Sequence, residues 1–162
     1  MSIAEAAHAL QQTGWATDLR ESALAYPIIL VIHLVCIAIF GGMIFVTNLR
    51  LLNVAFREAS VADIVASLRP WKHFGFVVMV TCGILLGSSK AVDYYANPYF
   101  IAKMTLLALT GVHALAFRKS VYRNPAPPSA DTARLAAILS TVLWLSIMSL
   151  GRWIAYYEAP KQ

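Results

Sequence analysis

The stretch YPIILVIHLVCIAIFGGMIFVTNLRLL, residues 26–52, decides the fold of this chain. A helix needs about 20 mostly apolar residues to cross the hydrocarbon core of a bilayer. This stretch carries no Asp, Glu, Lys or Arg between Tyr26 and Asn48, but it does carry His33. Because a titratable ring is costly inside a bilayer, it indicates a functional site. The sequence therefore predicts a membrane helix with a functional histidine.

The composition extends this prediction to the whole chain. Charged residues make up 13% of the 162 residues and hydrophobic residues 59%, whereas about a quarter of a soluble domain is charged. Ser2 and Glu5 have the spacing of a capping box, and Gly14 is placed to end the helix that they begin. We predict an all-α integral membrane four-helix bundle with a short N-terminal interfacial helix. It forms a single domain, residues 1–162, with spans at about 26–48, 70–88, 99–117 and 133–156.

The connector between the first two predicted spans has a helical pattern of its own. Ser60 and Asp63 have the spacing of an N-cap, and apolar residues follow at helical intervals from Val61. We expect a short helix on the membrane surface here, separate from the second span, which begins at Pro70.

The basic residues predict the orientation in the membrane. Eight lie in the links between spans one and two and between spans three and four: Arg50, Arg57, Arg69, Lys72, Arg118, Lys119, Arg123 and Arg134. Five lie on the opposite side: Arg20, Lys90, Lys103, Arg152 and Lys161. Links rich in Lys and Arg stay in the cytoplasm. We therefore expect the bacterial inner membrane with both termini in the periplasm, no cleaved signal peptide, and no nucleic-acid partner despite the net charge of +5.

The histidines suggest a haem site when their depth is estimated from the helical rise. His73 lies about 6 Å past Arg69, and His113 about 7–8 Å before Arg118, so the two rings share a level near the cytoplasmic side. Haem iron takes axial ligands from opposite sides, and a helical bundle offers an apolar slot. We predict that His73 and His113 bind haem b. His33, about 25 Å above Arg50, is a ligand of a second haem or a group next to the substrate.

Ordinary roles for the same two histidines are an alternative. His73 is close to the membrane surface, where its ring is readily solvated beside Lys72. His113 is able to hydrogen-bond a neighbouring backbone carbonyl. The sequence leaves both interpretations open.

A second cofactor prediction concerns copper. Cys36, Cys82, Met104 and Met148 fall at similar depths, and Cys36 is one helical turn from His33. Thiol, thioether and imidazole groups are the ligands of Cu(I). The same residue types are also ordinary fillers of apolar cores. The cysteines form no CxxC pair, which argues against a c-type haem or a thioredoxin-like site.

Three functions follow as alternatives. The first is a b-type cytochrome that transfers electrons within or across the membrane, with a quinone or a redox protein as partner. The second is a copper-binding or copper-transport protein. The third is a cofactor-free accessory subunit of a larger membrane complex; the chain itself is also a candidate homo-oligomer.

Four segments carry a family resemblance: YPIILVIHL (26–34), GGMIFVTNLRLL (41–52), ANPYFIAKM (96–104) and GRWIAYY (151–157). They are similar to an uncharacterised family of small bacterial four-helix membrane proteins, over most of the chain from about Trp15. A weaker similarity links the chain to the membrane domain of copper-resistance D proteins and to small dihaem cytochromes b. It rests on a histidine in span one followed by glycines, and on a lysine opening span three. The chain lacks the four-histidine set of a dihaem cytochrome, and the resemblance assigns no functional residue.

Overall fold

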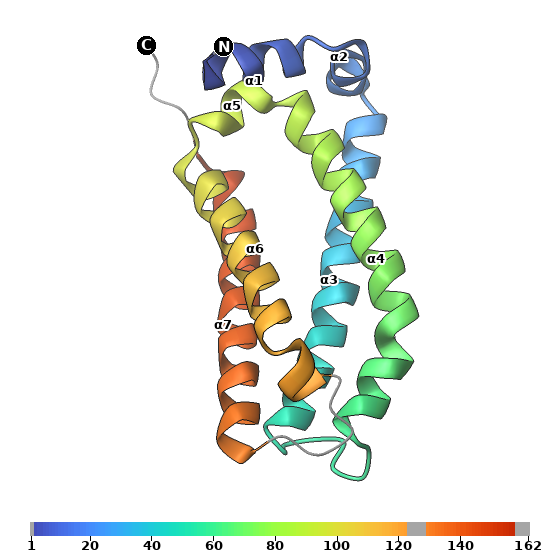
Figure 1. Ribbon diagram of the computed structural model, residues 1–162. Helices are drawn as coiled ribbons and strands as arrows, with labels where there is room; N and C mark the ends of the chain where they lie inside the picture. The colour runs from blue at the N-terminus through green and yellow to red at the C-terminus, as the bar shows by residue number, and fades with distance from the viewer. Residues whose placement is uncertain (1, 123–128, 158–162) are drawn as a thin grey trace.

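The computed structural model is a bundle of long helices (Figure 1), and it describes residues 2–122 and 129–157. Four helices are long and apolar enough to cross a membrane: α3 (Ala25–Leu51), α4 (Val61–Ser89), α6 (Pro98–Ala116) and α7 (Ala130–Ile154). The described residues include no strand. The prediction of an all-α four-helix membrane bundle is therefore confirmed, and the four helices indicate a lipid bilayer as its environment.

The four spans do not close into a complete ring. Helix α3 packs against α4 on one side and α7 on the other, and α7 in turn packs against α6. Among the described residues α4 and α6 make no contact with each other, and Figure 1 shows them well separated. A π-helical turn, η1 (Arg118–Tyr122), follows α6 and contacts α4 at one end of the bundle. Within the described residues, η1 therefore provides the contact between α4 and the chain at the C-terminal end of α6.

Three short helices lie across the opposite end, which we call the capped end: α1 (Ile3–Gln11), α2 (Gly14–Glu21) and α5 (Ala91–Tyr95). The backbone N–H of Val92 donates to Gln11 Oε1 at 2.8 Å, and Arg20 Nη1 donates to the Ser89 carbonyl at 3.4 Å. These bonds tie α1 and α2 to the junction of α4 and α5. The other end carries Arg50, Arg69, Arg118 and Arg134, and we call it the basic end.

Two predicted helix starts are confirmed, and two predicted boundaries are wrong. Ser2 and Glu5 form the capping box of α1, and the Ser60 side chain caps α4. Gly14 does not end α1 but begins α2, because the extended Thr13 makes the turn between the helices. Pro70 does not begin a new helix either. It lies inside α4, which runs unbroken for 29 residues, since a long membrane helix tolerates one missing backbone hydrogen bond.

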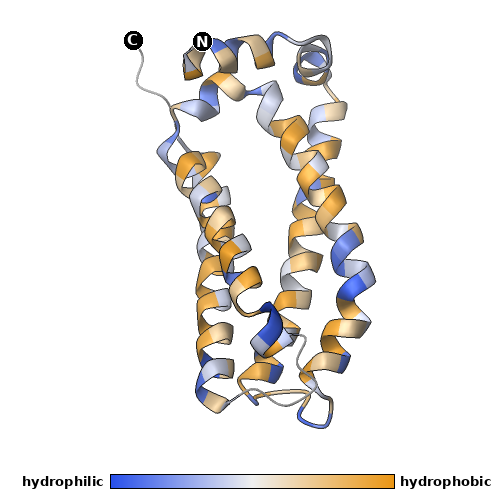
Figure 2. Ribbon diagram, in the orientation of Figure 1, coloured by the Kyte–Doolittle hydropathy of each residue, from blue (hydrophilic) through white to orange (hydrophobic). Residues whose placement is uncertain are grey.

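The basic end contains a cluster of packed apolar side chains. A buried cluster there joins α3, η1 and α7 through Leu51, Val121, Ala133, Ala136 and Ala137. Figure 2 shows that the long helices are mostly hydrophobic along their length, with a hydrophilic stretch in the part of α4 nearer the basic end. The small alanines let η1 and α7 approach closely. The cluster therefore stabilises the end of the bundle at which α6 is connected to α7. The connecting proline-rich link lies largely outside the described residues.

Candidate functional site

His33 is the best-positioned histidine for a functional role. It lies on α3, half-buried, and its Nδ1 is 2.9 Å from the backbone carbonyl oxygen of Met79 on α4. A carbonyl only accepts hydrogen bonds, so Nδ1 must carry the hydrogen and donate it. In the neutral ring Nε2 then keeps its lone pair, which makes it a potential base or metal ligand.

The ring of His33 packs directly against a glycine. A Cβ atom on Gly83 of α4 would lie 3.2 Å from His33 Cε1, closer than an ordinary contact. The absence of a side chain at position 83 therefore makes room for the imidazole. Gly83 lies one turn beyond Met79 on the same helix, so these two residues fix both the proton position and the orientation of the ring.

Lys103 brings a second nitrogen group to the same region from α6. Its ammonium is close enough to the His33 ring for their charges to interact. A Cβ atom on Gly151 of α7 would lie 3.7 Å from Lys103 Nζ, so the lysine crosses to the α7 side of the bundle. Among the described residues Lys103 Nζ has no hydrogen-bond acceptor. No buried side-chain nitrogen of the described residues lacks a partner, so this ammonium keeps contact with the surface of the bundle.

His113 and His73 have different surroundings. His113 is buried, its Nε2 is 3.0 Å from the carbonyl oxygen of Ala136 on α7, and its ring packs on Phe117 at 4.9 Å between centroids. A hydrogen bond to a backbone carbonyl was the alternative that the sequence left open, and the structure places that carbonyl on α7. His73 is exposed on α4, a helix that does not contact α6 in the described structure. No contact between their helices brings these two histidines together, and their ligation of haem stays a prediction.

The predicted copper ligands are partly brought together. Cys82 is buried, Cys36 is half-buried, and both are free. They lie on α4 and α3, two helices that pack against each other. Met148 packs at the α3–α7 contact, with its Sδ 3.9 Å from the position of a Cβ atom on Gly41. Met104 is 41% exposed. Within residues 2–122 and 129–157 no three His, Cys, Asp or Glu side chains gather into a metal-binding group.

A set of buried polar contacts in the basic half escaped sequence analysis. Asn48 Nδ2 on α3 donates at 3.1 Å to the hydroxyls of both Ser140 and Thr141 on α7. Lys72 Nζ on α4 donates at 3.1 Å to the Thr47 hydroxyl on α3. The signal was present in the sequence, because a lone Asn among apolar residues needs a partner, but the partner could not be chosen.

Tyrosines flank the spans at both ends. At the basic end burial raises the pKa of Tyr122 to about 12. At the capped end burial is the main cause that raises the pKa of Tyr94, and the phenol of Tyr26 adds to the effect. Lys90 Nζ lies 4.9 Å from the centre of the Tyr26 ring. Tyr122 and Tyr94 are therefore neutral at physiological pH. Tyr94 and Tyr26, at the capped end, belong to an aromatic layer at the membrane surface.

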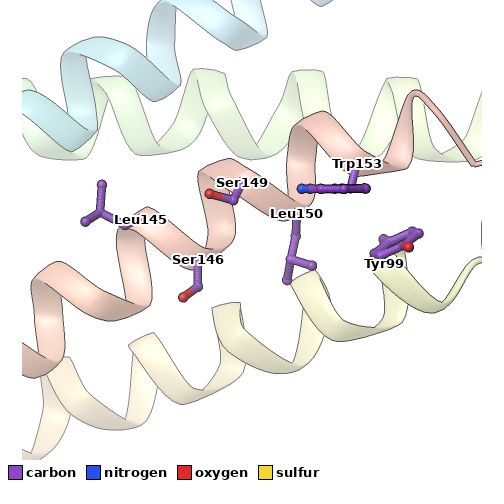
Figure 3. Close-up of a pocket in the computed structure, with 6 residues that line it drawn as sticks. All are labelled: Tyr99, Leu145, Ser146, Ser149, Leu150 and Trp153. Carbon is purple, nitrogen blue, oxygen red and sulfur yellow. The ribbon is translucent and has the colours of Figure 1, made fainter.

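A groove runs along α7 beside the start of α6 (Figure 3). Its volume is about 470 Å³, and it is lined by Tyr99, Leu145, Ser146, Ser149, Leu150 and Trp153. The Tyr99 and Trp153 rings stack with their centres 5.8 Å apart. Leu150 directly precedes Gly151, the residue next to Lys103 Nζ, so the groove and the lysine share one segment of α7.

Comparison with known proteins identifies a family but no activity. The model of a family of unknown function, DUF6644, matches residues 25–157, which include all four spans. The chain belongs to this family. Neither curated proteins nor solved structures gave a match. Membership of DUF6644 confirms the predicted likeness to an uncharacterised family, and the site must be interpreted from its own geometry.

Proposed function

We propose that this DUF6644 protein is a membrane b-type haem protein that transfers electrons, and that His33 would hold the haem iron. The hydrogen bond from His33 Nδ1 to the Met79 carbonyl carries the proposal. Histidines that bind metals commonly donate their second ring nitrogen to a carbonyl or carboxylate, which fixes the tautomer and leaves the other nitrogen free for the metal.

The donor set fits haem better than it fits a bare metal ion. The macrocycle supplies four of the iron's ligands, so a single protein histidine suffices, as in haem proteins with one proximal histidine. A bare ion needs several protein ligands, and in the described residues no three His, Cys, Asp or Glu side chains lie together. Bound haem supplies a one-electron carrier. His33 would hold the iron, and Gly83 would keep the ring in place.

The surroundings of His33 also suit haem. Lys103 is close enough to His33 for their charges to interact and has no hydrogen-bond acceptor in the described structure, so its ammonium is available to a haem propionate. Helices α4 and α6 make no contact within the described residues, and a flat apolar macrocycle would lie on this side of the bundle. His73 and His113 remain candidate ligands of the same or a second haem, but His113 Nε2 already faces Ala136.

An absorption spectrum of the full-length protein tests this proposal. The protein is expressed with a haem supply, purified in detergent, and its haem is counted against protein. We expect a Soret band that shifts on reduction, and close to one haem per chain. A Lys103→Met variant should bind haem about tenfold more weakly and keep the band positions, because it loses a charge-assisted bond but no iron ligand. Haem-free protein under these conditions would refute the proposal.

Copper binding is a second candidate, favoured by two free thiols, Cys36 and Cys82, on the packed helices α3 and α4. Two thiolates suffice for Cu(I), and His33 lies one turn from Cys36. Metal analysis after growth with copper should then find copper in the purified protein. Its loss in Cys36→Ser and Cys82→Ser variants, with retention in a Met104→Leu variant, would identify the thiols as ligands.

The electron partner and the orientation complete the proposal. A quinone ring could stack on Tyr99 or Trp153 and hydrogen-bond Ser146 in the groove of Figure 3, next to the segment that contacts Lys103. A redox protein or a second copy of the chain are the other partners. The basic end would face the cytoplasm of a bacterium, with the capped end in the periplasm.

A further inference from the structure

A second cavity lies at the basic end, far from His33, and the proposed haem does not use it. Its volume is about 360 Å³, within the range of ~300–1,000 Å³ for small-molecule sites. It lies where the C-terminal end of α3, the first residue of α4 and the start of α7 meet. The lining residues are Arg50, Leu51, Leu52, Asn53, Val61, Ala130, Ala133 and Arg134.

The lining combines two cations with an apolar floor. Arg50 comes from α3 and Arg134 from the first turns of α7, and none of the described lining residues is acidic. Leu51 and Ala133 belong to the buried cluster of the basic end, so the floor of the cavity is hydrocarbon. A ligand that satisfies both parts must be negatively charged at one end and apolar at the other.

Both arginines have guanidinium N–H groups that make no hydrogen bond within the described residues. Arg50 uses its Nε to donate to the Ala59 carbonyl at 2.6 Å, which anchors the side chain and leaves its two Nη groups without an acceptor in the described structure. Arg134 is exposed and makes no hydrogen bond there. Guanidinium groups bind phosphate oxygens with paired hydrogen bonds.

The start of α7 adds to the positive potential. Ala130 is its first residue and lines the cavity, so unpaired N–H groups of the first turn lie beside it. Ser129 caps the N–H of Thr132, two positions further along. Asp131 is acidic and lies in the same turn, but it is not among the residues that line the cavity.

We propose that this cavity binds the phosphate of an anionic membrane lipid. Arg50 and Arg134 would hold the phosphate, and the first carbons of the acyl chains would lie on Leu51 and Ala133. Basic pockets between membrane helices bind anionic headgroups in this way. The site lies at the level where the spans end, which is the level of lipid headgroups. It would tie α3, α4 and α7 together at the end opposite to the cap.

Lipid counting by native mass spectrometry tests the proposal on the full-length protein in a neutral detergent. The probes are dioleoyl phosphatidylglycerol, dioleoyl phosphatidylcholine and inorganic phosphate. We expect phosphatidylglycerol to bind saturably and about tenfold more tightly than phosphatidylcholine, since each basic residue contributes favourably to anionic lipid binding. Inorganic phosphate at the same concentration should not displace it, because it lacks the acyl chains.

The variants separate this cavity from the general charge of the basic end. Arg134→Gln should weaken phosphatidylglycerol binding about fivefold, and Arg134→Lys less, because lysine keeps the charge but not the paired donors. Arg69→Gln is the matched control, since Arg69 is exposed at the same end, does not line the cavity, and should leave binding unchanged. Equal binding of the two lipids, displacement by inorganic phosphate, full binding by Arg134→Gln, or an equal loss in Arg69→Gln would each overturn the proposal.

Discussion

Two histidines, one in each half of the bundle, make the same kind of hydrogen bond but leave opposite nitrogens free. In the basic half, His113 directs Nε2 at the Ala136 carbonyl at 3.0 Å. In the capped half, His33 directs Nδ1 at the Met79 carbonyl at 2.9 Å. Nδ1 lies close to the histidine's own backbone, whereas Nε2 is at the tip of the ring. His113 therefore uses the nitrogen at the tip of its ring in a contact between helices, whereas the tip nitrogen of His33 makes no hydrogen bond within the described residues.

The His113 and His33 rings also differ in the residues that surround them. His113 joins α6 to α7 beside the buried cluster, where Phe117 covers its ring. His33 joins α3 to α4, and the charged group that acts on it is Lys103, from a helix that α4 does not contact in the described structure. A buried polar group whose surroundings are complete stabilises the fold, while one that lacks partners in the resting structure is a candidate for binding.

The largest expected effect is the loss of haem from one histidine variant and not from the others. His33→Ala should bind no haem, because it removes the proposed iron ligand. His113→Ala and His73→Ala should keep most of their haem. The measurement is haem per chain from the reduced spectrum of each purified variant. If His113→Ala and His73→Ala lose haem and His33→Ala keeps it, the ligands are the pair predicted from sequence, and the comparison between the two halves is reversed.

Stability should respond in the opposite order. His113→Ala removes a buried hydrogen bond and leaves a cavity, so we expect the free energy of unfolding to fall by roughly 2–3 kcal/mol. In haem-free protein His33→Ala should cost about 1 kcal/mol, because its half-buried ring leaves a more open space. Denaturant titration in mixed micelles measures both values. Equal losses would mean that the capped half is packed as tightly as the basic half.

Much of the fold was predictable from sequence because membrane spans are long and continuous. The four spans and the caps at Ser2 and Ser60 follow from local patterns that depend on a few neighbouring residues. The error at Pro70 has a physical cause. Proline usually ends a helix, but a helix of 29 residues absorbs one missing backbone hydrogen bond.

The site was less predictable because depth along a helix does not give direction around it. Counting residues placed His73 and His113 at one level, but it could not show that His73 is exposed and that His113 faces α7. The same count left His33 without an imidazole partner. Its actual neighbours are a carbonyl, a glycine and a lysine, which carry no metal-ligand signal in a sequence.

A smaller effect should come from the polar contact that joins α3 to α7 in the basic half. Asn48→Ala removes two hydrogen bonds, and bonds of this kind in membranes average about 0.6 kcal/mol, so we expect a loss of about 1 kcal/mol. Ser140→Ala removes one of the two and should cost about half as much. The free energy of unfolding of both single variants and the double variant gives the coupling. A coupling of zero would mean that Thr141 alone satisfies Asn48.

The smallest effect tests the contact between His33 and Gly83 through a pair of glycines on one helix. Gly87 has no atom within 4 Å of where a Cβ would lie, whereas at Gly83 the His33 ring is 3.2 Å away. Alanine is favoured over glycine inside a helix by about 1 kcal/mol, so Gly87→Ala should stabilise the protein by up to that amount. Gly83→Ala should gain little, because the ring must shift by a few tenths of an ångström and its bond to Met79 weakens. In a His33→Ala background the obstacle is gone, and Gly83→Ala should then stabilise as much as Gly87→Ala does. Unfolding free energies of the haem-free variants measure these differences. If both substitutions stabilise the protein equally in the presence of His33, the ring does not rest on Gly83. The argument that Gly83 fixes the orientation of the ring, and with it the position of Nε2, would then fail.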